Sequence, residues 1–172
     1  MHQKLKTTFL VFFLLTYMTA CSDAGDKTSL KTGSMQGQLA SDFVLKDLEG
    51  KQVSLASFKN KNPVCIIFWA TWCPYCVVEI PKVKQIHAKY SDKGLKVIAI
   101  NIAANDPMPR VVAFQKKYEL PYTVLYDADN VVSRLYGVQG IPVSIIIDKK
   151  GIIQYRGYQL PENAEQLFPQ LL

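Results

Sequence analysis

Residues that bind metal ions are scarce in this sequence. Its 172 residues include four cysteines and two histidines. Two of the cysteines, Cys73 and Cys76, are separated by two residues, a spacing that also occurs in half of a zinc site. A structural zinc site needs four ligands, normally in two paired clusters. Cys21 and Cys65 stand alone, and both histidines are distant from any cysteine. We therefore expect no metal site, and the close cysteine pair requires another explanation.

Long apolar runs, runs of basic residues and internal repeats are also missing. The apolar run Phe9–Leu15 is too short to span a bilayer as a helix. The formal net charge of +6 is spread along the chain, so a solvated surface explains it and nucleic-acid binding finds no support. A hydrophobic content of 49% with 20% charged residues is typical of a globular protein. The length fits one domain with a short extension.

The N-terminal segment has the features of an export signal. Basic residues, the apolar run Phe9–Leu15 and small residues precede Cys21, which predicts a signal peptide over 1–20. The tetrapeptide Met18–Cys21 resembles a bacterial lipobox, in which the cysteine is lipidated and becomes the new N-terminus. Methionine stands where leucine is usual, so an ordinary cleaved signal is the alternative. We expect lipidation of Cys21, because a single cysteine directly after a signal otherwise lacks a purpose.

A polar segment separates this signal from the globular part. Residues 21–38 are rich in Ser, Thr, Gly, Lys and Asp and have almost no large apolar residues. This composition predicts a flexible linker between a lipid anchor and a domain over 39–172. We expect an exported lipoprotein, anchored in a membrane through its N-terminal lipid and facing the periplasm or the cell exterior.

The two close cysteines lie where a strand is followed by a helix. The apolar run Val64–Phe68 has the length and β-branched content of a buried strand, and apolar residues recur at helical spacing over 77–90. Cys73 should therefore lie at the helix N-terminus, where unpaired N–H groups and the helix dipole stabilise a thiolate. The spacing also suits a small disulfide ring with Cys76. The pattern predicts a redox site.

Hydrophobic periodicity predicts the remaining elements. They are a β-hairpin within 40–58, strands over 95–101 and 122–126, helices over 108–118 and 131–136, a hairpin of 143–148 with 152–156, and a closing helix over 161–171. Strands that alternate with helices predict an α/β fold with a mixed sheet. Asp127–Asn130 lacks the glycine and distal glutamate of a calcium loop and is expected to be a polar turn. Cys65 is expected to be a small buried hydrophobe, and His87 a residue of the helix surface.

These motifs resemble a known family. The run Phe68–Cys76, with the pattern FWAxWCxxC, is similar to the active-site signature of the thioredoxin superfamily. Pro81 resembles the proline within the following helix, and Gly140–Pro142 resembles the loop that carries the cis-proline. Segment 40–55 and the Glu79-x-Pro81 motif resemble the membrane-anchored TlpA/ResA-type branch. The resemblance implies a thioredoxin-like fold, namely a central mixed sheet flanked by helices, with an N-terminal β-hairpin and an inserted helix–strand unit.

The resemblance also implies roles for the residues at the site. Cys73 is expected to be the attacking thiol and the more exposed of the pair, and Cys76 to resolve the mixed disulfide. Glu79 is expected to accept the proton that leaves Cys76, since the preceding strand lacks the aspartate that thioredoxin uses. The alternative is that Glu79 is a first-turn acid favoured by the helix dipole.

Five further residues are predicted to contact the substrate. They are Trp72, Pro74, Tyr75, Ile141 and Pro142. Pro74 and Tyr75 lie between the cysteines and tune the Cys73 thiolate. The bond between Ile141 and Pro142 is expected to be cis, since such bonds are mainly confined to X-Pro and mark tight turns. Backbone groups near Ile141 are expected to pair with an extended substrate segment.

The expected activity is thiol–disulfide exchange in the cell envelope. The resemblance implies that the protein reduces disulfides of exported proteins, among them apocytochrome c, and that a membrane electron-donor protein reduces it in turn. We expect a monomer without a bound cofactor, whose redox group is the Cys73–Cys76 pair. The same chemistry run backwards would make an oxidase. Two alternatives are a peroxiredoxin-like thiol peroxidase and a binding or chaperone module without turnover.

Overall fold

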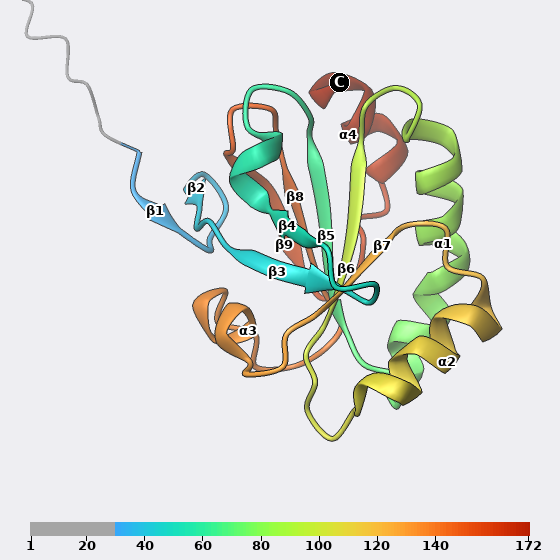
Figure 1. Cartoon of the computed structure of the whole chain (residues 1–172). Helices are drawn as coiled ribbons and strands as arrows, with labels where there is room; N and C mark the ends of the chain where they lie inside the picture. The colour runs from blue at the N-terminus through green and yellow to red at the C-terminus, as the bar shows by residue number, and fades with distance from the viewer. Residues whose placement is uncertain (1–29) are drawn as a thin grey trace, which may run out of the picture.

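The structure is a computed structural model that describes residues 30–172 (Figure 1). The predicted signal peptide 1–20, the lipidation site Cys21 and the predicted linker up to residue 29 lie outside the described residues and stay predictions. Within the part of the chain that is described, no helix has both the length and the apolar composition to cross a membrane.

A mixed sheet of seven strands forms the centre of the molecule. In spatial order its strands are β4 (Gln52–Ser54), β3 (Val44–Asp47), β7 (Thr123–Tyr126), β6 (Lys96–Asn101), β5 (Val64–Trp69), β8 (Val143–Ile147) and β9 (Ile153–Gly157). β5, β6 and β7 run parallel, and the outer pairs are antiparallel. The predicted mixed sheet, its N-terminal hairpin β3–β4 and the hairpin β8–β9 are therefore confirmed.

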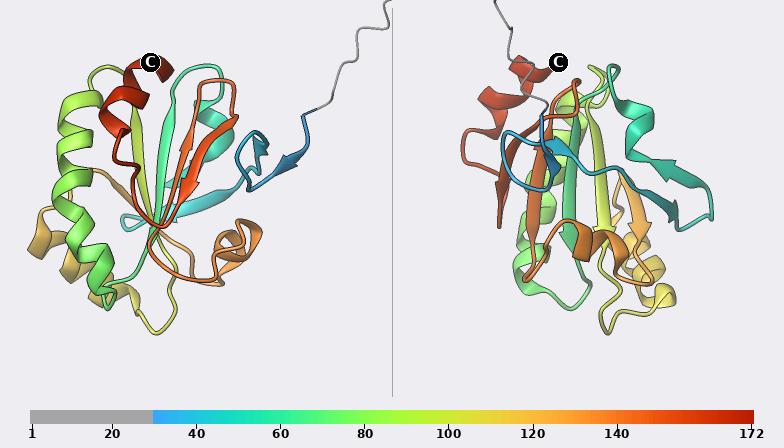
Figure 2. Two further views of the ribbon diagram at one scale, coloured as in Figure 1. Left: turned by 180° about the vertical axis from the view of Figure 1, so that it is seen from behind. Right: turned by 90° about the vertical axis from the view of Figure 1, so that its left-hand side faces the viewer.

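Helices cover both faces of the sheet (Figures 1 and 2). They are the 3-10 helix η1 (Leu55–Phe58) and the α-helices α1 (Pro74–Tyr90), α2 (Met108–Tyr118), α3 (Val131–Leu135) and α4 (Ala164–Leu171). α2 and β7, which follow β6 in the chain, form the predicted inserted helix–strand unit.

Asp127 lies in the predicted polar turn before α3. Its carboxylate accepts hydrogen bonds from the N–H groups of Val132 and Ser133 at 3.2 and 2.7 Å.

The central strand β5 divides the core into two parts. All six of its residues are buried, and successive side chains point to opposite faces of the sheet. Cys65, Ile67 and Trp69 pack into the core under α1, α2 and α4. Ile66 and Phe68 pack into the other core, which includes residues of η1 and α3. Burial on both faces explains why this strand is a continuous apolar run rather than an alternating one.

The first described residues lie against the sheet edge at β9. β1 (Thr32–Gly33) pairs in parallel with β2 (Leu39–Ala40). The Gly37 N–H donates to the Ile153 carbonyl at 2.8 Å, and the Ile153 N–H donates to the Gln38 carbonyl at 2.9 Å (Figure 2). Residues 31–38, which the composition assigned to the flexible linker, are thus held on the domain in the structure. Backbone hydrogen bonds hold them, and these do not require the large apolar side chains that this segment lacks.

Candidate active site

The two close cysteines lie at the junction of β5 and α1. Cys73 is the N-cap of α1, and its Sγ accepts the N–H of Cys76 at 3.1 Å. Pro74 occupies the first turn, where its fixed φ suits a helix start and its missing N–H is not needed. Cys73 and Cys76 are joined by a disulfide, with their Cα atoms 5.3 Å apart. The predicted position of the pair between strand and helix is confirmed.

Both cysteines are buried in this disulfide form. Cys73 is 3% exposed and Cys76 is 6% exposed, so the expectation that Cys73 is the more exposed residue was wrong for this state. The reason is the cis-proline loop, because the carbonyl oxygen of Ile141 lies 3.8 Å from Cys73 Sγ. Trp72, Pro74 and Tyr75, which adjoin the two cysteines in the chain, are exposed.

The loop before β8 lies beside the disulfide. The peptide bond between Ile141 and Pro142 is cis, as predicted from the resemblance. Ile141 is half-buried and packs against both cores. β8 pairs with β5 through Val143, opposite Phe68. This pairing brings the loop to the end of β5 at which the cysteines lie.

Glu79 lies next to Cys76 in a partly buried position. Its Oε2 accepts the backbone N–H of Leu160 at 3.1 Å, and both Glu79 and Cys76 line a cavity of about 20 Å³. Trp69 also lines this cavity, and its buried indole N–H has no hydrogen-bond partner among the described residues. Since α1 begins at Pro74, its first turn contains no acidic residue. Glu79 therefore lies beyond the turn in which the helix dipole acts strongly on a carboxylate.

The charge of Glu79 influences two neighbouring groups. Burial raises the pKa of the Cys65 thiol to about 12, and the nearby Glu79 carboxylate adds to the shift. Burial also raises the pKa of the Tyr155 hydroxyl, again with a contribution from Glu79. Cys65 is fully buried and free, which confirms the prediction of a small buried hydrophobe.

A buried carboxylate that the sequence analysis missed holds the loop before Cys73. Asp106, 1% exposed, accepts the N–H of Thr71 at 2.7 Å, the Thr71 hydroxyl at 2.5 Å and the Asn101 side-chain amide at 2.7 Å. The Trp72 indole N–H donates to the Ala104 carbonyl at 2.7 Å. Asn101 ends β6, which is parallel to β5. Polar residues just after a parallel strand lie at the carboxyl edge of the sheet, where binding and catalytic sites form. The position of Asp106 shortly after the predicted strand 95–101 could therefore have indicated it from the sequence.

A groove of about 480 Å³ opens beside the disulfide. Three predicted substrate-binding residues line it, Tyr75, Ile141 and Pro142. Its other wall, which the sequence analysis missed, lies in β9 and between β9 and α4, and consists of Tyr155, Tyr158, Gln159, Leu160, Pro161 and Glu162. We name this the tyrosine groove. The other two predicted substrate-binding residues, Trp72 and Pro74, are exposed near the disulfide and do not line it.

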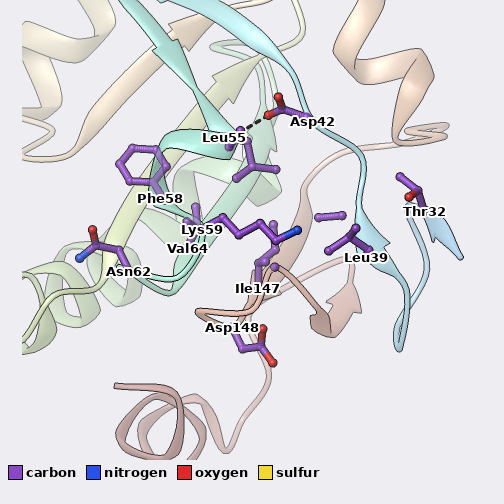
Figure 3. A pocket seen from close by; sticks show the side chains of 13 residues that line it. Thr32, Leu39, Asp42, Leu55, Phe58, Lys59, Asn62, Val64, Ile147 and Asp148 are labelled. Atoms are coloured by element: carbon purple, nitrogen blue, oxygen red, sulfur yellow. Dashed lines mark hydrogen bonds between the residues drawn. The ribbon is translucent and has the colours of Figure 1, made fainter. Parts of the chain in front are cut away.

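A second cavity, of about 280 Å³, lies at the opposite end of β5 (Figure 3). Leu39, Leu55 and Val64 contribute apolar walls to it. The carboxylates at its edge are already engaged, since Asp42 accepts the N–H of Ala56 at 2.7 Å and Asp148 accepts that of Ile152 at 2.9 Å. Val64 begins the strand whose other end carries the cysteines, so this cavity is separate from the redox site. Among residues 30–172, no three metal-ligating side chains lie close enough together to hold an ion.

Comparisons with known proteins agree with this site. The AhpC/TSA family matches residues 36–156. The thiol-disulfide oxidoreductase ResA of Bacillus thuringiensis subsp. konkukian is 38% identical over 132 residues, which cover 76% of this chain and 75% of the relative. ResA of Bacillus cereus strain ZK is 31% identical over 172 residues, covering 94% and 95%. The crystal structure of a secreted disulfide oxidoreductase of Mycobacterium tuberculosis matches with a TM-score of 0.63 at 26% identity, covering 75% and 93% of the two chains.

Proposed function

Because the chain belongs to the AhpC/TSA family and is a thiol–disulfide oxidoreductase of the ResA type, we propose that it reduces disulfides in exported proteins. The observation that carries the proposal is the position of Cys73 at the start of α1. Its sulfur accepts the Cys76 N–H at 3.1 Å. In the reduced protein this N–H and the helix dipole stabilise a Cys73 thiolate, which is the nucleophile of disulfide exchange.

Reduction of a substrate proceeds in two exchanges. The Cys73 thiolate attacks one sulfur of the substrate disulfide, an enzyme–substrate disulfide forms, and the other substrate sulfur leaves as a thiolate that takes up a proton. Cys76 then loses its proton and attacks Cys73 Sγ. The Cys73–Cys76 disulfide forms and the second substrate sulfur leaves as a thiol. Two electrons pass from the protein dithiol to the substrate.

Glu79 is the proposed acceptor of the Cys76 proton. It lines the same small cavity as Cys76 and is partly buried. A carboxylate within reach of a proton that must leave can act as a general base. The cavity of about 20 Å³ is large enough for one water, which allows the transfer to occur directly or through a water molecule.

The proposed cellular setting follows from the N-terminal motifs. A signal over 1–20 and a lipid on Cys21 would anchor the domain on the outer side of a membrane, where disulfides form and persist. The structurally similar Mycobacterium tuberculosis protein is a secreted one, which supports an exported location. A membrane protein that carries electrons outward would regenerate the Cys73–Cys76 dithiol. Apocytochrome c is a proposed substrate, since the resemblance to the TlpA/ResA branch implies it.

A trapping experiment tests the reductase function. In the native host, Cys76→Ser should accumulate disulfide-linked adducts through Cys73, because the second exchange is blocked, and mass spectrometry should identify the partners. Cys73→Ser, the matched control, should trap none. If the two variants give the same adducts, or if the purified dithiol form reduces no protein disulfide, the proposal is wrong.

The same proteins separate the two alternative functions. A peroxidase of the peroxiredoxin type has the motif Pro-x-x-x-Thr-x-x-Cys, whereas this chain has Ile66 and Ala70 at the positions of the proline and the threonine before Cys73. Consumption of peroxide at a rate comparable to disulfide reduction would favour that alternative. A binding module would keep its activity in Cys73→Ser, whereas a reductase would lose it.

A further inference from the structure

We propose that the segment Tyr158–Glu162, between β9 and α4, is a specificity-determining wall that receives a large apolar or aromatic side chain next to the cysteine of an extended substrate segment. This inference rests on the proposed reductase function and names the class of substrate side chain that the site prefers. The tyrosine groove lies between this wall and the disulfide helix α1.

Two exposed aromatic rings border the groove. Tyr75, on α1, is 68% exposed, and Tyr158 is 69% exposed. Ile141 and Pro142 also line the groove. Exposed aromatic residues gathered at one concave place are typical of binding surfaces rather than of ordinary surface, and tyrosine offers a large contact area at a small cost in side-chain entropy.

Contacts within the wall hold it in one shape. The Tyr155 hydroxyl donates to the Gln159 carbonyl at 2.7 Å. The Tyr155 side chain occupies the place where a Cβ on Gly157 would lie, so only glycine at position 157 leaves room for it. On the other side, a Cβ on Gly140 would lie 3.8 Å from the ring of Tyr158. The Tyr158 ring therefore lies next to the cis-proline loop.

The wall is also anchored to the helix that carries the disulfide. Glu79 accepts the Leu160 N–H at 3.1 Å. Lys82 donates to the carbonyls of Leu160 and Pro161 at 3.1 and 3.3 Å. Glu79 and Lys82 are three residues apart on α1 and therefore share a face of the helix. These three hydrogen bonds fix the distance between the wall and the Cys73–Cys76 disulfide.

The position and chemistry of the groove identify its occupant. Ile141 lines the groove, and its carbonyl lies 3.8 Å from Cys73 Sγ, so a segment joined to Cys73 in a mixed disulfide has residues next to the groove. The volume of about 480 Å³ is within the range of ligand pockets. Apart from Gln159 and the acidic Glu162, the residues that line the groove are apolar or aromatic. An apolar or aromatic side chain therefore fits it better than an acidic one.

The test compares three disulfides on the full-length reduced protein. Two are peptide disulfides that differ only in having phenylalanine or serine beside the cysteine, and the third is 5,5′-dithiobis(2-nitrobenzoate), which has no peptide segment. The wild type should favour the phenylalanine peptide over the serine peptide in kcat/KM by about two- to tenfold. Tyr158→Ala should abolish this preference, and it should lower kcat/KM for the phenylalanine peptide more than for the small disulfide. Tyr158→Phe should keep the preference, as should Leu135→Ala, which removes an exposed apolar side chain from α3.

Two results with Tyr158→Ala would overturn the proposed role of the wall. One is retention of the phenylalanine preference. The other is an equal loss of rate on all three disulfides, because an equal loss indicates general damage to the site. Failure of the wild type to reduce any of the three contradicts the reductase function and the inference with it. A wild type that reduces both peptides equally contradicts the inference alone.

Discussion

The carboxylate of Glu79 accepts a hydrogen bond from the backbone N–H of Leu160, 81 residues further along the chain, at 3.1 Å. This bond joins the helix that carries the Cys73–Cys76 disulfide to the wall of the tyrosine groove. One side chain thus lines the cavity beside Cys76 and also holds the surface next to which a substrate segment would lie. The two roles can be separated by substitution.

Glu79→Gln should slow the second exchange without loosening the groove. The amide oxygen of glutamine still accepts the Leu160 N–H, but the side chain no longer takes up a proton at neutral pH. We expect release of the second substrate thiol to slow by about a hundredfold in single-turnover experiments, with an unchanged melting temperature. Glu49→Gln, at an exposed turn, is the control for the loss of one charge. An unchanged rate in Glu79→Gln would show that Glu79 has a structural role only.

Gly157→Ala should disturb the wall, whereas Gly140→Ala should be tolerated. A Cβ at position 157 would overlap the hydroxyl of Tyr155, so the ring must move and lose its hydrogen bond to Gln159. A Cβ at position 140 would lie in ordinary contact with Tyr158 at 3.8 Å. Urea unfolding should show a loss of about 1 kcal/mol for Gly157→Ala and a smaller change for Gly140→Ala. Equal stabilities of the two variants would contradict this account.

Asp106→Ala should destabilise the loop before Cys73. It leaves the Thr71 N–H, the Thr71 hydroxyl and the buried amide of Asn101 without their acceptor. A buried donor without a partner costs about 1–3 kcal/mol, so we expect a loss of at least about 3 kcal/mol in urea unfolding. Asp129→Ala, which removes an exposed carboxylate, should change stability by less than about 0.5 kcal/mol. A similar small effect of Asp106→Ala would mean that the network does not support the loop.

Cys65 should not react in the folded protein. It is fully buried, and burial raises the pKa of its thiol to about 12. Because the thiolate is the reactive form, iodoacetamide at pH 8 should alkylate Cys73 of the reduced protein within minutes and leave Cys65 unmodified. Peptide mapping by mass spectrometry distinguishes the sites, and denaturant should expose Cys65 as a positive control. Alkylation of both at equal rates under native conditions would contradict the structure.

His87 should make the fold less stable in mild acid. His87 is partly exposed on α1, in keeping with the predicted helix-surface position, but its Nδ1 is buried and has no hydrogen-bond partner among the described residues. Burial lowers the pKa of His87, an effect that Lys96 strengthens and Asp92 opposes. The unfolded chain therefore takes up the proton first as the pH falls through about 6.5. The melting temperature should decrease from pH 7.5 to 5.5, and less so in His87→Phe. Equal pH dependence of the two proteins would exclude this cause.

Local patterns in the sequence predicted most of the elements and the centre of the site. The apolar run Val64–Phe68 identified β5, and the spacing of Ile80, Val83 and Ile86 identified the buried face of α1. The short separation of Cys73 and Cys76 indicated a disulfide. These features depend on backbone geometry over a few residues, which is why they can be recognised without knowledge of the fold.

The chemistry of the site can be recognised from local sequence, as a cysteine pair at the start of a helix in a domain of alternating strands and helices. The surroundings of that pair depend on contacts between distant segments of the chain. Asp106 reaches Thr71 across 35 residues, and Leu160 reaches Glu79 across 81. The Tyr158 ring and the cis-proline loop meet because β8 pairs with both β5 and β9. Contacts of this kind depend on the order of strands in the sheet, and short-range hydrophobic spacing carries no information about that order.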